Sequence, residues 1–239
     1  MSTLKIAIQK SGRLNEESIQ ILKDAGISID NGIDQLKAEA SNFPLEVLYL
    51  RNSDIPQYLI DGVVDIAIVG DNLLVEKGGD IEVIQKLGFS KCKVSVAVPK
   101  AFEYKSVQDL DGMRIATSYP KTVLDFFNSK GVRVDIHEIS GSVEIAPNIG
   151  LADAIVDIVS SGSTLFKNNL KEVEVIFKSE AVLAVSPKVS FESQKIIDTL
   201  KFRIESVLRA RKLKYILMNV PDDKIDAVGK ILPVLRSLT

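Results

Sequence analysis

Small hydroxyl-bearing residues follow an apolar segment in the second half of the chain. The apolar run 154–159 predicts a buried strand that contains Asp157, and the strand leads into Ser160, Ser161, Gly162, Ser163 and Thr164. Backbone N–H groups and hydroxyls in such a run favour an anion, and Thr164 could cap a following helix. Several hydrogen bonds to a charged group, at about 1.5–3 kcal/mol each, could hold a phosphate without a lysine. The segment could bind a phosphorylated sugar, with Asp157 facing the pentose hydroxyls, or could be an ordinary Ser/Gly turn.

Cations gather at two predicted strand ends near the N-terminus. Lys10 and Arg13 stand on either side of Gly12, after a short apolar segment. Both could bind oxygens of a pyrophosphate or a triphosphate, and Arg13 offers a bidentate fork. The alternative is a solvated basic turn. Arg51 ends another predicted strand and could either join the anion site or pair with Asp54.

Two further groups of polar residues could contact a substrate. Asp71 and Asn72 offer a carboxylate and an amide suited to a base edge or a metal, although an Asp-Asn turn alone is a weak signal. A hydroxyl-rich turn at 117–119 ends another predicted strand. Glu144 provides a second carboxylate that could share a ribose diol with Asp157, near a carbon that becomes cationic when a leaving group departs.

The single histidine and the single cysteine are interpreted as structural. His137 lies in a predicted strand, and Cys92 has lysines on both sides and no histidine near it in the sequence. Because a cysteine nucleophile needs an activating neighbour, we predict no covalent nucleophile.

Composition narrows the class of protein. With 239 residues, 46% hydrophobic and 26% charged, the chain is long enough for a full core in one or two domains. A formal net charge of −2 argues against non-specific nucleic-acid binding. One cysteine permits no internal disulfide, no signal-peptide pattern begins the sequence, and no apolar run has membrane-spanning length. We expect a cytoplasmic protein.

Short apolar runs alternate with amphipathic segments, which predicts an α/β fold. Helices are expected at 15–25, with Asn15 as N-cap, and at 191–213, where apolar residues recur at helical spacing. The polar loops follow strand ends, which is where open parallel sheets bind ligands. The other predicted elements are helices at 55–61, 122–129 and 222–234, and strands at 4–9, 47–51, 66–69, 93–99, 114–117, 133–138, 154–159, 181–185 and 215–220.

The motifs occur in the order and roughly the spacing of one known family. They are Gln9–Arg13, Asp61–Asp65 with Gly70–Asn72, Arg114–Pro120, Gly141–Glu144 and Gly150–Leu165. Over residues 5–235 the chain resembles ATP phosphoribosyltransferase, the first enzyme of histidine biosynthesis. The resemblance implies a two-lobed α/β catalytic core like a type II periplasmic binding protein, with the active site between the lobes. It implies that lobe I comprises 1–90 and 184–213, and that lobe II comprises 91–183.

The family's reaction joins N1 of the adenine of ATP to C1 of phosphoribosyl pyrophosphate and releases pyrophosphate with the help of Mg²⁺. The resemblance implies that the 160–164 loop binds the 5-phosphate and that Asp157 and Glu144 bind the ribose hydroxyls. It implies that the pyrophosphate and the ATP phosphates contact Lys10, Arg13 and Arg51. We expect Mg²⁺ to be bound mainly through substrate phosphates. Other substrate-binding residues so implied are Gln9, Ser11, Gly12, Asp71, Asn72, Thr117, Ser118, Tyr119 and Leu165.

The C-terminal residues depart from the family's long form. That form resembles this chain in the motifs and carries a ferredoxin-like regulatory domain, which binds histidine and helps to assemble hexamers. Residues 214–239 resemble only its first strand and helix. We interpret the chain as a long form with an incomplete regulatory domain, and expect histidine inhibition to be absent or weak. We expect a homo-oligomer, a dimer for the core and a hexamer for the complete long form, without nucleic-acid or membrane partners.

Two alternatives are considered, one from another class of protein and one that is also an enzyme. A solute-binding protein would use the same two-lobed fold without chemistry, because a fold does not determine a function. The absence of a signal-peptide pattern and the phosphate-type loops in both lobes argue against it. A nucleobase phosphoribosyltransferase could use the same phosphate loop with a free base as the acceptor.

Overall fold

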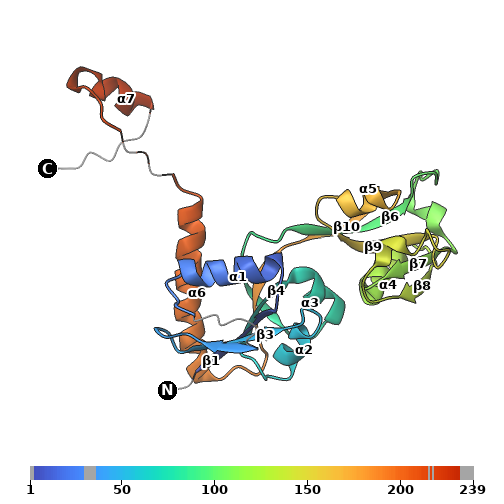
Figure 1. The fold of residues 1–239 in the computed structure, drawn as a ribbon, viewed down its shortest axis with the longest axis horizontal. Coiled ribbons are helices and arrows are strands. Elements are labelled where there is room, and N and C mark those ends of the chain that lie inside the picture. Colours follow the sequence, from blue (N-terminus) through green and yellow to red (C-terminus); the bar gives the residue numbers. More distant parts are fainter. Residues whose placement is uncertain (1–2, 30–35, 215, 217, 232–239) are drawn as a thin grey trace.

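The computed structural model describes residues 3–29, 36–214, 216 and 218–231. Within them the chain forms two α/β lobes, each built on its own sheet, connected by two segments that cross between the sheets (Figure 1). The first crossing lies near residue 90 and the second near residue 180, between β10 and β11. No helix in this described part of the chain is long and apolar enough to cross a membrane.

The sheet of the first lobe has six strands in the order β2-β3-β1-β4-β11-β5. Its three central strands run parallel and place their carboxyl ends at one edge, while β2 and β11 run antiparallel to their neighbours. The bounds are β1 (Leu4–Gln9), β2 (Lys37–Glu39), β3 (Leu45–Leu50), β4 (Ile66–Gly70), β5 (Glu82–Lys86) and β11 (Ala181–Val185).

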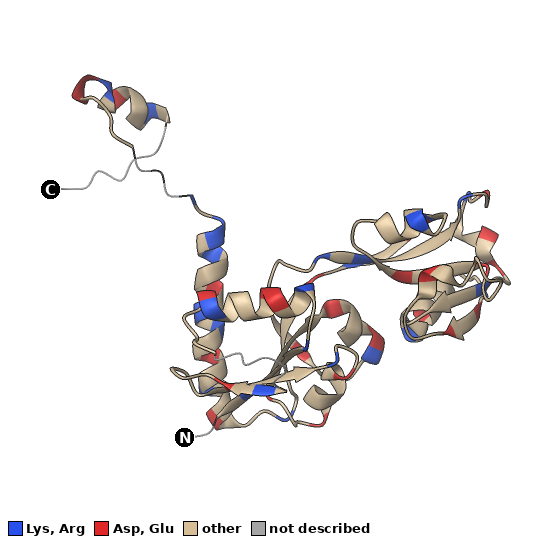
Figure 2. Cartoon of the chain, in the orientation of Figure 1, with Lys and Arg blue, Asp and Glu red and all other residues tan. Residues whose placement is uncertain are grey.

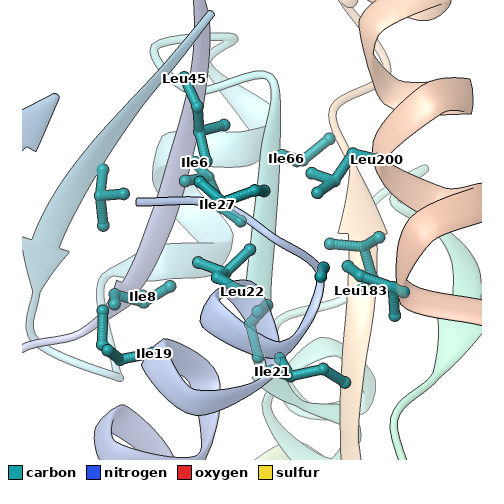
Figure 3. Close-up of a cluster of buried hydrophobic side chains, with 14 of the residues drawn as sticks. Ile6, Ile8, Ile19, Ile21, Leu22, Ile27, Leu45, Ile66, Leu183 and Leu200 are labelled. Atoms are coloured by element: carbon teal, nitrogen blue, oxygen red, sulfur yellow. The ribbon is translucent and has the colours of Figure 1, made fainter. Parts of the chain in front are cut away.

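Four helices cover the two faces of this sheet. One face packs against α1 (Arg13–Asp24) and α6 (Phe191–Arg211), and the other against α2 (Ile55–Ile60) and α3 (Asp71–Lys77). Figure 3 shows the first of these two interfaces, where strand residues such as Ile6 and Leu183 meet helix residues such as Leu22 and Leu200. All four of these side chains are fully buried, and burial of a Leu or Ile side chain contributes about 1.5–3 kcal/mol.

The second lobe contains a five-stranded sheet in the order β10-β6-β9-β7-β8. Strands β7, β8 and β9 are parallel, and β6 runs antiparallel to both β9 and β10. Helix α4 packs on one face, while α5 and the short 3-10 helix η2 pack on the other. The bounds are β6 (Cys92–Pro99), η1 (Val107–Leu110), β7 (Arg114–Thr117), α4 (Pro120–Ser129), β8 (Asp135–Glu138), η2 (Val143–Ile145), β9 (Ala154–Val159), α5 (Ser163–Lys167) and β10 (Leu170–Ser179).

The C-terminal elements η3 (Asp222–Lys224) and α7 (Ile225–Ile231) stand apart from both sheets in Figure 1. Neither element buries a residue. The strand predicted at 215–220 is not present at its described residues, and residues 215 and 217 lie outside them. The helix predicted at 222–234 is described as far as Ile231.

Two local expectations were wrong. Helix α1 begins at Arg13 with Gly12 as the N-cap, so Asn15 lies in the first turn and donates its amide to the Gln9 carbonyl at 2.6 Å. The predicted turn at 70–72 is instead the start of α3, which begins directly at Asp71 after β4. The sequence-based assignment also missed β2, β5 and β10, of which β10 is the longest strand among the described residues.

Candidate active site

The hydroxyl-rich loop follows the central strand of the second lobe. Strand β9 is hydrogen-bonded to β6 and β7, and its residues Ala154, Ile155 and Val156 are fully buried. The chain then turns at Gly162, whose φ of 73° lies in the left-handed region that favours glycine. The hydroxyls of Ser161 and Ser163 lie 3.0 Å apart. The buried strand thus fixes the start of the loop, and the glycine turns its small side chains together.

A small pocket of about 110 Å³ opens above this loop. The 3-10 helix η2 contributes Glu144, which is held at the pocket by the buried Val143 beside it. Strand β9 contributes Asp157. The structure therefore brings together seven of the predicted residues, namely Glu144, Asp157, Ser160, Ser161, Gly162, Thr164 and Leu165.

The surroundings of the pocket change the pKa of Asp157. Burial raises the pKa of Asp157 from its usual 3.8 to about 6, and the nearby negative charge of Glu144 adds to the effect, while the Ile158 backbone N–H opposes it. Neither carboxylate has an ion-pair partner among the described residues. A buried carboxylate without a cation is costly to ionise, and hydroxyl donors from a ligand would relieve that cost.

The cationic loop follows the central strand of the first lobe. Gln9, which ends β1, donates its amide to the Ser11 carbonyl at 2.7 Å, and the Lys10 N–H donates to the Leu50 carbonyl at 2.8 Å. Gly12 has a φ of 85° and leads into α1. The loop backbone is therefore fixed by hydrogen bonds, although its two cations are exposed.

The three predicted cations share one edge of the first sheet. Strands β1 and β3 pair in parallel with Gln9 opposite Leu50, so Lys10 and Arg51 leave the sheet side by side. Arg13 has a side chain that is 71% exposed and approaches Glu17 at 3.4 Å. None of these three cations lines the 110 Å³ pocket. Two groups of predicted site residues therefore lie on different lobes.

A contact between the lobes uses two of the predicted residues. Asn72 on α3 donates its amide to the Tyr119 hydroxyl at 3.1 Å, and it also exchanges hydrogen bonds with Ser179 at 3.0 Å. Both Asn72 and Tyr119 are buried. Burial, together with the negative charge of Asp157, raises the pKa of Tyr119. This contact lies next to the carboxylate pocket and stabilises one relative position of the lobes.

Glu76 extends this contact and was not recognised in the sequence. Its carboxylate accepts the backbone N–H groups of Lys121 and Thr122 at 2.9 and 2.8 Å, and the Thr122 hydroxyl at 2.7 Å. These N–H groups begin α4 and would otherwise lack a partner within the helix. A carboxylate of one lobe thus caps a helix of the other. No local signal marks such a residue, because a single glutamate on a helix is usually solvated.

The remaining predicted residues lie near this contact. The Thr117 hydroxyl accepts the Tyr119 N–H at 2.9 Å, and the Ser118 hydroxyl donates to the Ile139 carbonyl at 2.7 Å. Ser118 and Tyr119 line a second pocket of about 500 Å³ between the lobes. The N–H of Asp71 donates to the Glu180 carbonyl at 3.0 Å. The hydroxyls of Thr117 and Ser118 therefore have local partners, and Asp71 is held through its backbone.

The two residues interpreted as structural occupy unremarkable positions. His137 on β8 lies 3.1 Å from Asp135 at the surface. Cys92 is half-buried at the start of β6, and burial raises the pKa of its thiol, which a hydrogen bond to Ser179 partly offsets. The described residues contain no group of three or more His, Cys, Asp or Glu that could hold a metal ion.

Comparison with known proteins relates this geometry to one family. The model of the ATP phosphoribosyltransferase family, HisG, matches residues 51–206. A curated ATP phosphoribosyltransferase of Cytophaga hutchinsonii is 56% identical over 240 residues, covering 100% of this chain and 84% of the relative. The corresponding protein of Parabacteroides distasonis is 50% identical, covering 99% of this chain and 83% of the relative.

Solved structures agree with the sequence relatives. The ATP phosphoribosyl transferase (HisG:HisZ) complex from Thermotoga maritima is similar with a TM-score of 0.74 and 31% identity, covering 87% of this chain and 100% of that one. A substrate binding protein of an amino acid ABC transporter has a TM-score of 0.57 at 13% identity, covering 87% of this chain and 94% of that one, which shows the shared two-lobed fold alone. The chain belongs to the ATP phosphoribosyltransferase family, and it is a transferase with the two-lobed catalytic core of that family.

Proposed function

We propose that the chain transfers the 5-phosphoribosyl group of phosphoribosyl pyrophosphate to N1 of the adenine of ATP and releases pyrophosphate, as the first step of histidine biosynthesis. One observation carries the proposal: two unpaired carboxylates and a hydroxyl-rich loop share a single pocket in a member of this family. A phosphorylated pentose needs both an anion site and acceptors for its hydroxyls, and the pocket offers the two side by side.

The proposed roles follow from the chemistry of each group. The loop 160–164 binds the 5-phosphate through hydroxyls and backbone N–H groups. Asp157 and Glu144 accept hydrogen bonds from the ribose hydroxyls. As the bond from C1 to the pyrophosphate oxygen breaks and the bond to N1 forms, positive charge develops at C1, and the two carboxylates stabilise it. The electron pair leaves with pyrophosphate, so no redox partner or covalent nucleophile is needed.

The cations of the first lobe are proposed to hold the phosphate chains. Lys10, Arg13 and Arg51 stand at neighbouring strand ends, where they could contact the pyrophosphate and the ATP phosphates from the opposite side of the reacting carbon. Further proposed substrate contacts come from the loops that end β1, β4, β7 and β9, and the residues are Gln9, Ser11, Gly12, Asp71, Asn72, Thr117, Ser118, Tyr119 and Leu165.

Mg²⁺ is proposed as the metal, bound mainly through substrate phosphates. The donor set suits this, because the carboxylates Glu144 and Asp157 could each add one oxygen while phosphates and water supply the rest. When bound, the ion would neutralise charge on the leaving pyrophosphate. The residues of this chain would orient the ribose and the adenine in line with that leaving group.

The lobes and the assembly are proposed as follows. Residues 1–90 and 181–213 form lobe I, because β11 (Ala181–Val185) pairs within its sheet, residues 91–180 form lobe II, and residues 214–239 belong to a regulatory segment of the long form. We propose a homo-oligomer, with a dimer for the core and a hexamer for the complete long form, acting in the cytoplasm. Histidine inhibition is proposed to be weak.

Product analysis tests the reaction directly. The chain is incubated with phosphoribosyl pyrophosphate, Mg²⁺ and either ATP or free adenine, and the nucleotide products are separated and identified. We expect a phosphoribosyl adduct with ATP and none with adenine. Adduct formation with adenine would instead favour a nucleobase phosphoribosyltransferase. Absence of product from both, together with thermal stabilisation by an amino acid alone, would favour a solute-binding protein.

The same assay tests regulation. Product formation is measured with and without added histidine, and we expect less than twofold inhibition. Strong inhibition of this chain would refute the proposal of weak feedback while leaving the proposed reaction intact.

A further inference from the structure

A third pocket lies at the crossing between the two lobes, and four of its nine lining residues are lysines. It has a volume of about 450 Å³, and its charged residues are Lys86, Lys91, Lys93, Lys178 and Glu180. Figure 2 shows basic residues along the strands that connect the lobes. This concentration of positive charge is unusual because the whole chain carries a formal net charge of −2.

Two of these charges already have partners. Lys93 lies 2.6 Å from Glu172, whose other oxygen accepts the Ser95 hydroxyl. Glu180 accepts the Gly88 N–H at 3.0 Å, so its carboxylate is held by the backbone at the crossing. The described part of the chain provides no ion-pair partner for Lys86, Lys91 or Lys178. Three unneutralised lysines therefore share one pocket.

The backbone holds these lysines in positions that do not favour stability. Lys178 on β10 pairs directly opposite Lys93 on β6, and like charges opposite each other destabilise a sheet. Lys91 follows Ser90, whose φ of 48° is left-handed and unfavourable for a residue other than glycine. The Ser90 hydroxyl is bonded to Glu17 of α1 at 2.5 Å, which fixes this turn. Local strain of this kind accumulates where a structure serves binding.

The lysine pocket continues into the proposed phosphate site. Val159 and Ser160 line both the 450 Å³ pocket and the 110 Å³ pocket. A ligand in the lysine pocket would therefore lie beside the start of the 160–164 loop. It would carry several negative charges within a short length, because three separate ammonium groups are available to it.

We propose that the pocket formed by Lys86, Lys91 and Lys178 binds a chain of two or more phosphates, either free pyrophosphate or the phosphate tail of a nucleotide. Binding of a phosphate chain to this pocket does not depend on the proposed function. The proposed function matters only for which phosphate chain, pyrophosphate or the tail of ATP, occupies the pocket during the reaction. Each lysine contributes a hydrogen-bonded point charge to the phosphate oxygens, and binding removes the repulsion among the lysines.

Calorimetric titration with sodium pyrophosphate, without Mg²⁺ and at low ionic strength, measures this site directly. The test variant is Lys86→Gln with Lys178→Gln, and the control is Lys23→Gln with Lys130→Gln, which removes the same charge at exposed positions outside the pocket. We expect wild type and control to bind equally. We expect the test variant to bind pyrophosphate at least tenfold more weakly at the lysine pocket, leaving only binding at the cationic loop of the first lobe, which Arg13→Ala weakens. Because all four lysines are exposed, thermal unfolding should show that both variants fold.

Several results would overturn the proposal. The first is that wild type does not bind pyrophosphate, and the second is that the test variant binds it as tightly as wild type. The third is that Arg13→Ala loses binding while the test variant keeps it in full. The last result would assign the anion to the cationic loop of the first lobe. Inorganic monophosphate and AMP serve as further ligands and should bind at least tenfold more weakly than pyrophosphate; equal binding of AMP would also contradict a site for a phosphate chain.

Steady-state kinetics then distinguishes the two sources of phosphate. If the tail of ATP fills the pocket, the test variant raises KM for ATP and leaves AMP binding unchanged. If the leaving pyrophosphate fills it, the variant raises the product-inhibition constant of pyrophosphate and leaves KM for ATP unchanged. Pyrophosphate binding in a chain that forms no product with ATP would refute the proposed function and support the site, so the two failures are distinguishable.

Discussion

Two glycine turns, at Gly12 and Gly162, stand in equivalent positions of the two lobes and differ in what surrounds them. Each follows a buried central strand and leads into a helix, with a φ of 85° at the first and 73° at the second. The turn of the second lobe lies in a pocket with two carboxylates. The turn of the first lobe carries exposed cations that line no part of that pocket.

The difference indicates how the two sites are prepared for ligands. The carboxylate pocket exists before the ligand binds, because β9 and η2 hold its groups, and the raised pKa of Asp157 shows that this arrangement costs stability. The cations of the first lobe are solvated and cost little until a phosphate orders them. We therefore expect substitutions in the second lobe to change stability and binding together, and substitutions in the first lobe to change binding alone.

The largest effect is expected for Asp157→Asn. The variant retains the shape of the side chain but loses the charge that accepts from the ribose hydroxyls and stabilises positive charge at C1. We expect kcat/KM for phosphoribosyl pyrophosphate to fall about 100-fold or more, with a smaller change in KM for ATP. Steady-state kinetics with each substrate varied in turn measures this.

Asp80→Asn is the matched control, because Asp80 is an exposed aspartate outside the pocket. It should keep wild-type kinetics. Wild-type kinetics in Asp157→Asn itself would refute the assignment of this carboxylate to the sugar.

Arg13→Ala should have a smaller effect that is confined to binding. Loss of one charge-assisted contact to a phosphate chain corresponds to roughly 10–100-fold in affinity. Since the Arg13 side chain is 71% exposed, we expect the midpoint of thermal unfolding to stay within about 1–2 °C of wild type. The two measurements are initial rates at varied substrate and a thermal melt.

Arg13→Lys separates charge from geometry at this position. It should recover part of the lost affinity, because lysine keeps the charge but not the bidentate fork. A marked loss of stability in Arg13→Ala would instead contradict the contrast between the lobes.

The pH dependence should follow Asp157. With a pKa of about 6, roughly nine tenths of this carboxyl is protonated at pH 5, so affinity for the ribosyl substrate should fall about tenfold between pH 8 and pH 5. Equilibrium titration with phosphoribosyl pyrophosphate across this range gives the curve. Asp157→Asn should show a smaller slope, namely the part that comes from ionisation of the ligand's own phosphates. An equal slope in the variant would assign the titration to another group.

Stability should change with pH in the opposite direction. The native pKa of Asp157 is raised above its usual 3.8, so between these two values the native state binds more protons than the unfolded state. The free energy of unfolding should fall by roughly 2–3 kcal/mol as pH rises from about 4 to above 6, and Asp157→Asn should remove this fall. Urea unfolding of both proteins at pH 4, 5, 6 and 7 provides the comparison.

Local patterns predicted the elements of the fold better than their contacts. Strands such as β1 and β9 and the helix α6 follow apolar periodicity, and the structure contains them with small shifts. The start of α1 was misplaced because the backbone conformation of Gly12, which no periodicity reveals, begins the helix. The strand β10 alternates charged and apolar residues only over Glu172–Val175, which is too short a pattern to mark a ten-residue strand.

The candidate site was accessible from the sequence only where its groups share a loop. The 160–164 loop is visible as a run of small hydroxyl residues. Glu144, which lies 13 residues before Asp157, was predicted as a second carboxylate for the sugar, but only the fold shows that it lines the same pocket. The buried hydrogen bonds of Asn72 with Tyr119 and Ser179 join residues 47 and 107 positions apart. The sequence does not encode such contacts locally, because the relative position of two lobes determines them.

The smallest effect is expected for Glu76→Gln, at the contact that holds the lobes together. The carboxylate accepts three donors from the start of α4, and the amide keeps one acceptor oxygen while placing an NH₂ group against the others. We expect a loss of about 1 kcal/mol in unfolding free energy and changes of less than fivefold in both KM values.

Glu82→Gln, at an exposed position on β5, is the control. Glu76 lines the 500 Å³ pocket between the lobes but not the 110 Å³ carboxylate pocket. A large kinetic effect would therefore mean that catalysis depends on the angle between the lobes, and that the carboxylate pocket alone is not preformed for the reaction. Small-angle scattering of the ligand-free variant would then show a larger radius of gyration than wild type, whereas unchanged scattering with unchanged stability would remove Glu76 from the interlobe contact altogether.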